Sequence, residues 1–135
     1  MRSATALSTL LASGCIVYAD PDPGPAPVND PPVIEWADAS CFYDEYYRDD
    51  VWWFEADLRD DEGLDDVVAV YADVYDGLTE EWVDAFELYH DGGHTWYSAW
   101  QEDSTWLDCD HYDYIVDFVA EDVVGEGEAY TVVLY

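Results

Sequence analysis

Apolar and polar residues alternate with a period of two along most of the chain that follows Pro32. In the clearest run, residues 51–59, apolar side chains occupy every second position: Trp52, Phe54, Ala56 and Leu58. This period is that of a half-buried β-strand, with one face toward a core and the other toward solvent. Turn signals rich in Asp and Gly separate the runs, at residues 60–63, 76–77 and 91–93. No long helical period interrupts them, which favours an all-β fold.

The alternating segments number about seven and recur at roughly even spacing. They cover residues 33–36, 51–59, 68–75, 86–89, 96–101, 112–121 and 129–134. Residues 79–82 could add a single helical turn at most, with Thr79 as its cap. Many short strands joined by short turns predict one antiparallel β-sandwich over residues 33–135.

The charge balance is strongly acidic, with 33 Asp and Glu against three Arg and a formal net charge of −30. Binding to nucleic acid through phosphates needs clustered Lys and Arg, so we exclude it as a function. Docking on anionic lipid is excluded for the same reason. Highly charged chains can be disordered, but disordered chains are poor in aromatic residues, and 17% of these residues are aromatic. The composition therefore indicates a packed domain.

The first 14 residues carry one charge, Arg2, followed by a short run of apolar and small residues. This arrangement is typical of a secretory signal peptide and is too short to span a bilayer. Residues 10–15, Leu-Leu-Ala-Ser-Gly-Cys, resemble the lipobox of bacterial lipoproteins. The resemblance implies that residues 1–14 are removed, that Cys15 is lipidated, and that the mature chain is held to a membrane outside the cytoplasm. An ordinary signal peptide, with Cys15 unmodified, is the alternative.

Residues 15–32 read as a linker, because all six prolines of the chain lie between Pro21 and Pro32. Proline fixes φ, lacks an N–H and favours the extended polyproline II conformation. At about 3.1 Å per residue, such a segment could reach on the order of 50 Å. We expect a semi-rigid stalk between membrane and domain; the alternative is a disordered leader without a selected length.

Two segments carry a resemblance to a known fold. Residues 114–125 follow the pattern Tyr-x-Val-x-Phe-x-Ala-x-Asp-x-x-Gly, which resembles the F–G hairpin of fibronectin III-like and other immunoglobulin-like domains. Residues 54–67 resemble strand B and the B–C turn of bacterial immunoglobulin-like modules. The whole chain is similar to small acidic bacterial surface lipoproteins that carry one such domain. The resemblance implies an immunoglobulin-like β-sandwich and an exported location, and it implies no reaction.

Cys41 and Cys109 remain once Cys15 is assigned to lipid. An even number of remaining cysteines in an exported protein predicts one disulfide. In an up-and-down strand order the connections that follow the first and fifth strands lie at the same end of the sandwich, which would bring the two cysteines together. Two unpaired thiols are the alternative.

No catalytic signature is present: the sequence lacks Gly-x-Ser-x-Gly, His-Glu-x-x-His and a glycine-rich phosphate loop. His90 and His94 flank the turn at Asp91, and the three together could hold Zn²⁺ or Cu²⁺. Exposed loop residues without a metal are the alternative. We expect the protein not to be an enzyme.

The acidic loops suggest calcium, which takes six to eight oxygen ligands. In an immunoglobulin-like order the B–C, D–E and F–G loops share one end, where the stalk also enters. The first of these loops holds five acids between residues 60 and 66, Asp66 among them. The candidate Ca²⁺ ligands are Asp60, Asp61, Glu62, Asp65, Asp122 and Glu126. The alternative is a solvated acidic surface adapted to saline surroundings.

Seven tryptophans are many for a domain of this size. Trp53, Trp96 and Trp100 are the candidates for an exposed platform that stacks on sugar rings or buries a partner's apolar surface. The alternative is that these side chains cover a thin core.

These patterns predict a non-catalytic, membrane-anchored lipoprotein of the cell envelope that acts as a structural or interaction module. Ile16 follows the lipid cysteine where Asp would favour inner-membrane retention, so we expect the outer membrane. The expected partners are the membrane, through the lipid anchor only, and an envelope protein or glycan. The alternative function is a Ca²⁺-dependent adhesion or carbohydrate-binding module that uses the acidic loops and the aromatic residues.

Overall fold

The computed structural model describes Gly24, residues 28–111 and residues 113–135. The predicted signal peptide, the lipidation site Cys15 and most of the proline-rich linker lie outside the described residues.

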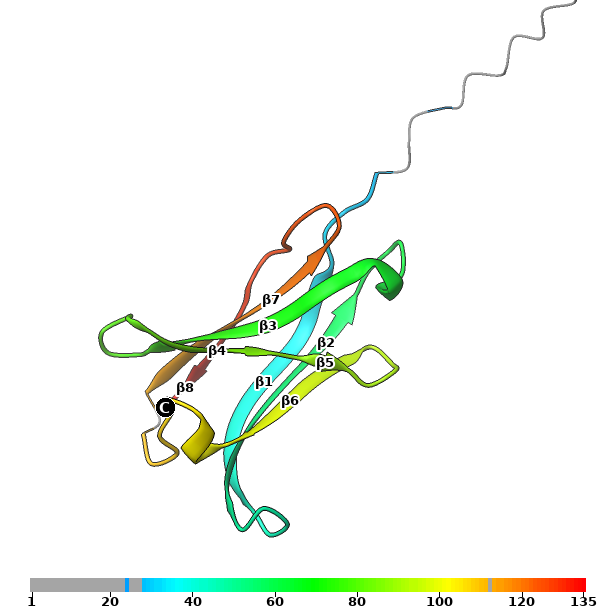
Figure 1. Cartoon of the computed structure of the whole chain (residues 1–135). Helices are drawn as coiled ribbons and strands as arrows, with labels where there is room; N and C mark the ends of the chain where they lie inside the picture. The colour runs from blue at the N-terminus through cyan, green and yellow to red at the C-terminus, as the bar shows by residue number, and fades with distance from the viewer. Residues whose placement is uncertain (1–23, 25–27, 112) are drawn as a thin grey trace, which may run out of the picture.

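The described chain is an all-β sandwich of two four-stranded antiparallel sheets, as predicted (Figure 1). The first sheet has the order β1-β2-β6-β5 and the second the order β4-β3-β7-β8. The strands are β1 (Val33–Asp44), β2 (Asp49–Arg59), β3 (Val67–Asp76), β4 (Trp82–Glu87), β5 (Tyr89–His90), β6 (Thr95–Gln101), β7 (Tyr114–Asp122) and β8 (Tyr130–Leu134). Two short 3₁₀ turns, η1 (Leu64–Asp66) and η2 (Glu102–Ser104), are the helical elements among the described residues.

The core lies between the two sheets and follows from the alternation in sequence. The four apolar side chains of β2 predicted to share a face are all at most 2% exposed. Phe54 is central: its ring stacks on Phe86 of β4 at 4.5 Å between centroids and lies 6.5 Å from that of Phe118 in β7. Full burial of one such side chain contributes about 1.5–3 kcal/mol to stability. The inward residues of β2, β3 and β7 therefore hold the two sheets together.

The first strand is much longer than the predicted segment 33–36. β1 continues to Asp44 and pairs with β2 along its whole length, with a bulge between Ile34 and Trp36. Its inward positions include Ala37 and Ala39, which are 6% and 3% exposed. Alanine is only weakly apolar, so the alternation of apolar and polar residues is hard to recognise in this part of the sequence, although the strand continues.

The predicted strand at residues 86–89 is divided between the two sheets. β4 ends at Glu87 in the second sheet, and β5 begins at Tyr89 in the first. Between them, Leu88 is 3% exposed and donates its N–H to the carbonyl oxygen of Val70 at 2.8 Å. The chain crosses from one sheet to the other at this buried leucine.

In place of the helical turn predicted at residues 79–82, the structure has a hydrogen-bonded turn at residues 77–79 that leads into β4. One carboxylate oxygen of Asp76 accepts the backbone N–H groups of Leu78 and Thr79, each at 2.8 Å. These backbone donors, that of Thr79 first, lower the pKa of Asp76 below its ordinary value. The cap of this turn is thus Asp76, three residues before the predicted cap.

The predicted disulfide joins Cys41 and Cys109, with 5.7 Å between their Cα atoms. Cys41 lies within β1, and Cys109 lies in the connection from β6 to β7. The bridge therefore ties an edge strand of the first sheet to the segment that leads into the second. The cysteines are 68 residues apart, and closing a loop of that length stabilises the fold by about 4 kcal/mol in the chain-entropy model.

Candidate cation site and aromatic residues

The acidic loops gather at the end of the sandwich where the chain enters from the linker. The connections β2–β3, β5–β6 and β7–β8 all lie at this end, and the β7–β8 loop lies beside residues 28–32 (Figure 1). The connection β1–β2 and the segment between β6 and β7 lie at the opposite end (Figure 1). This is the loop arrangement that the calcium hypothesis assumed.

Three aspartates converge at this end: Asp60, Asp66 and Asp122 each place one carboxylate oxygen within 4.8 Å of the others. Asp60 directly follows β2, Asp66 closes η1, and Asp122 ends β7. The antiparallel register explains the meeting, because Val67, the residue after Asp66, pairs with Asp122. Two oxygens on opposite sides of one Ca²⁺ ion, each about 2.4 Å from it, would lie about 4.8 Å apart. The three oxygens can therefore ligate a single ion.

Asp122 is held rigidly for a carboxylate. Asp122 is only 2% exposed, and its Oδ1 accepts the backbone N–H groups of Val124 and Gly125 at 2.7 and 2.9 Å. Its Oδ2 accepts the Asn29 side-chain amide at 3.2 Å. These contacts fix one ligand oxygen before any ion binds.

Three other oxygens around Asp122 are buried without a hydrogen bond. Among the described residues, Asp60 Oδ2, Asp66 Oδ1 and Asn29 Oδ1 have no partner. Leaving a polar atom buried and unpaired costs about 1–3 kcal/mol, and more when the group is charged. A cation bound between the aspartates would give the unpaired oxygens of Asp60 and Asp66 a partner.

The structure brings together two of the six predicted calcium ligands, Asp60 and Asp122. Asp66, in the same loop but not among the six, completes the cluster. Asp65, the neighbour of Asp66, is exposed and lies outside it. Because Asp65 and Asp66 are adjacent in sequence, their side chains point in different directions, and it is the Asp66 carboxylate that lies beside Asp122.

The remaining predicted ligands have other contacts. Asp61 forms an ion pair with Arg59, whose Nε also lies 3.0 Å from Glu35 Oε1. Glu126 accepts the hydroxyl of Tyr71 in β3, and burial together with this bond raises the pKa of Tyr71.

Glu62 lies beside the cluster and does not join it. Lost hydration and the nearby Asp60 carboxyl raise the pKa of Glu62 above its ordinary value. It lines a hollow of about 130 Å³ together with Asp30 and Asp60. Negative charge at this end of the sandwich is thus crowded even outside the cluster itself.

The linker is fastened to the same end. Pro32 is fully buried, and Gly127 in the β7–β8 loop lies directly against its backbone. A Cβ at Gly127 would be 3.4 Å from the carbonyl carbon of Pro32 and would overlap its oxygen. Gly127 is held in place by donating its N–H to Ala120 at 2.9 Å. Glycine is needed here because the two backbones approach closely.

The three tryptophans predicted to form one platform do not share one face of the first sheet. Trp53 faces outward from the first sheet and stacks on Tyr97, with 5.1 Å between ring centroids and 13° between planes. Trp96 is 6% exposed and stacks on His90 at 4.2 Å, so it belongs to the core. Trp100 lies on the same side of β6 as Trp96, and its ring centroid is 5.8 Å from that of Phe86. Trp53 therefore forms an aromatic surface with Tyr97, and Trp96 is corrected to a core residue.

The predicted group of His90, Asp91 and His94 does not converge. In the described part of the chain, only the three clustered aspartates bring three possible metal-ligand atoms within 4.8 Å. His90 Nε2 instead lies 2.6 Å from the carbonyl oxygen of Gly93. The β5–β6 turn thus forms its own local hydrogen bonds.

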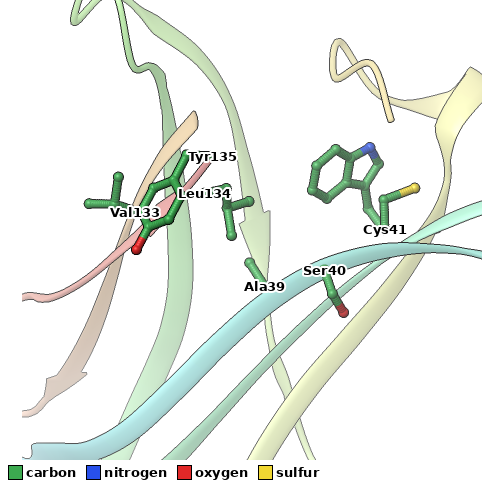
Figure 2. A pocket seen from close by; sticks show the side chains of 7 residues that line it. Ala39, Ser40, Cys41, Val133, Leu134 and Tyr135 are labelled. Atoms are coloured by element: carbon green, nitrogen blue, oxygen red, sulfur yellow. The ribbon is translucent and has the colours of Figure 1, made fainter. Parts of the chain in front are cut away.

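A groove of about 370 Å³ opens between the edge strands of the two sheets (Figure 2). Ala39, Ser40 and Cys41 of β1 line one side, and Val133 to Tyr135 line the other (Figure 2). Trp52 completes the lining, which includes no Asp, Glu, His or Arg side chain. The groove therefore offers no pair of titratable side chains for acid–base chemistry.

No family model matches this chain, and neither a curated protein nor a solved structure matches it. Across the described residues, the structure contains no helix that is long and apolar enough to cross a membrane.

Proposed function

We propose that the protein is an exported lipoprotein in which one immunoglobulin-like domain acts as a non-catalytic interaction module of the cell envelope. The lipobox resemblance at Cys15 and the proline-rich linker support the tether. The strand orders β1-β2-β6-β5 and β4-β3-β7-β8 support the immunoglobulin-like assignment, since they correspond to A-B-E-D and C′-C-F-G. We place the protein in the outer membrane.

The observation that carries this proposal is the way the linker joins the domain. Pro32 is buried against Gly127, and Asn29 donates to Asp122. The domain is thus held at one end, and among the described residues outward side chains of the first sheet such as Trp36 and Tyr97 are exposed. A tethered module with such exposed side chains is suited to binding a partner beside the membrane.

Replacing Cys15 with Ser tests the tether. The variant should move from the membrane fraction to the soluble exported fraction, and it should lose incorporation of labelled fatty acid. Ser8→Ala is the matched control, because it changes one residue of the predicted signal peptide and keeps the residues that resemble a lipobox. An unchanged membrane fraction for Cys15→Ser would refute the anchor.

A second candidate function is Ca²⁺-dependent binding, favoured by the aspartate cluster with its unpaired buried oxygens. Calcium at this position would join the β2–β3 loop to the end of β7, next to the fastened linker. It would also offset the repulsion among acids that have no basic partner within the cluster. Adhesion or glycan binding would then depend on calcium through the rigidity of this end.

Thermal unfolding of the full chain in CaCl₂, MgCl₂ and EDTA at matched ionic strength tests this candidate. A ligand at 100 times its Kd adds about 2.7 kcal/mol, which is roughly 10 °C or more for a domain of this size. We expect Ca²⁺ to raise the Tm more than Mg²⁺, and Asp66→Asn to abolish the rise. Asp65→Asn is the matched control, since it removes one exposed charge from the same loop. Equal responses of the two variants would leave the acids as a solvated surface.

A further inference from the structure

The outward face of the first sheet carries carboxylates that oppose one another without a cation between them. Asp38 of β1 pairs in register with Glu55 of β2. Like charges directly opposite each other in a sheet are destabilising. Arg59, at the end of β2, is already bound to Glu35 and Asp61. Among the described residues the other basic side chain is Arg48, in the β1–β2 turn.

Aromatic rings border these carboxylates on the same face. The Trp53 ring stacks on Tyr97, and its Nε1 donates to Glu55 at 3.0 Å. Trp36 is 43% exposed and lies opposite Asp57. We name this surface the acidic-aromatic face; it consists of Trp36, Asp38, Trp53, Glu55, Asp57 and Tyr97. Rings beside carboxylates suit a planar cation, which can pair with the acid and stack on the ring.

A hollow of about 360 Å³ adjoins this face and is lined by Tyr89 and by residues 97–100. It exists because β5 has two residues and pairs only with Trp96 and Tyr97. Beyond Tyr97 the edge of β6 has no neighbouring strand on that side within the described chain. The crossing of the chain at Leu88 thus leaves space beside the face for a long side chain.

We propose that the acidic-aromatic face binds an arginine-rich segment of a partner protein. This inference rests on the proposed function of an interaction module and names the class of partner. Charge complementarity selects the occupant, because the chain has a formal net charge of −30 and a second copy would be repelled. A neutral glycan fits less well, since it brings no positive charge to the opposed carboxylates of Asp38 and Glu55.

The test measures binding of fluorescent octa-arginine to the full-length chain in detergent, by anisotropy at about 0.15 M ionic strength. Octa-lysine and neutral cello- and chito-oligosaccharides serve as comparison probes. The first variant is Asp38→Asn with Glu55→Gln. The matched control is Asp73→Asn with Asp117→Asn, which removes an opposed acidic pair from the outward face of the second sheet. Thermal unfolding checks that both variants fold.

We expect the first variant to weaken octa-arginine binding about tenfold, from the loss of two exposed ion pairs, and the control to change it by less than about twofold. Octa-lysine should bind more weakly than octa-arginine, because guanidinium stacks better on aromatic rings. Equal weakening by both variants would overturn the proposal in favour of a general negative field. Absence of binding, or oligosaccharide binding in place of peptide binding, would also overturn it. None of these outcomes depends on lipidation, so the anchor is tested separately by Cys15→Ser.

Discussion

Gly127→Ala tests the joint between linker and domain with the smallest possible change. The new methyl group would overlap the carbonyl oxygen of Pro32 and lie 3.4 Å from its carbonyl carbon. Neither backbone can yield easily, because Pro32 is fully buried and Gly127 donates its N–H to Ala120 at 2.9 Å. Overpacking of this kind costs about 1–3 kcal/mol. For a domain of about 100 residues, the Tm should fall by roughly 5–20 °C.

Thermal and urea unfolding of the full chain, followed by tryptophan fluorescence, measure this loss. Gly93→Ala is the matched control, since a Cβ there would meet only Asp91 Oδ1, at 3.8 Å. We expect the control to change the free energy of unfolding by no more than about 0.5 kcal/mol. Limited proteolysis should also cut Gly127→Ala sooner near residues 28–32 than the wild type, because the overlap loosens this segment.

Two results would refute the reasoning about this joint. One is equal stability of Gly127→Ala and Gly93→Ala, which would mean that the backbones separate without cost. The other is a destabilised Gly127→Ala whose linker resists proteolysis as well as the wild type does. In that case the loss would lie in the β7–β8 loop and the linker would not be fastened by it.

Three further predictions follow from single contacts. Cys109→Ala opens the disulfide and should lower the free energy of unfolding by about 4 kcal/mol under oxidising conditions, while a reductant should lower the Tm of the wild type and leave the variant unchanged. The lowered pKa of Asp76 means that its stabilising contribution is present above its ordinary pKa of 3.8 and is lost as the pH falls through the lowered value. Asp76→Asn should therefore lose less stability than the wild type on acidification, and parallel pH curves would count against this. The raised pKa of Glu62 means that its charged carboxylate destabilises the folded state. Glu62→Gln should therefore raise the Tm at neutral pH, and the gain should disappear once acid protonates the wild-type residue. A gain that persists at low pH would have another origin.

Much of the fold could be predicted because the alternation of β2 and β7 depends only on neighbours in sequence. Phe54 and Phe118 lie on the faces that the period assigns to them, and both are 0% exposed. The same argument failed for β1, where buried Ala37 and Ala39 give a weak signal. It also failed at Leu88, because an alternating pattern cannot tell which sheet a strand joins.

The candidate cation site shows the same division. The acidic loops were predicted to share an end, since strand order and antiparallel direction determine where loops gather. The sequence could not show which of these acids lie close together. In the structure Asp66 belongs to the cluster and Asp65 does not. That choice depends on the register of Val67 with Asp122, which is a contact between residues 55 positions apart.

The sequence by itself determined most of the strand-forming segments, the sandwich architecture and the pairing of Cys41 with Cys109. It also contains the residues that resemble a lipobox and the proline-rich segment, on which the proposed anchoring depends. Only the tertiary structure decided that Trp96 is a core residue, that Asp60, Asp66 and Asp122 converge, and that Asp38 opposes Glu55. The physical reason is that local patterns arise from the geometry of one strand, whereas these contacts arise from the register between strands far apart in the chain.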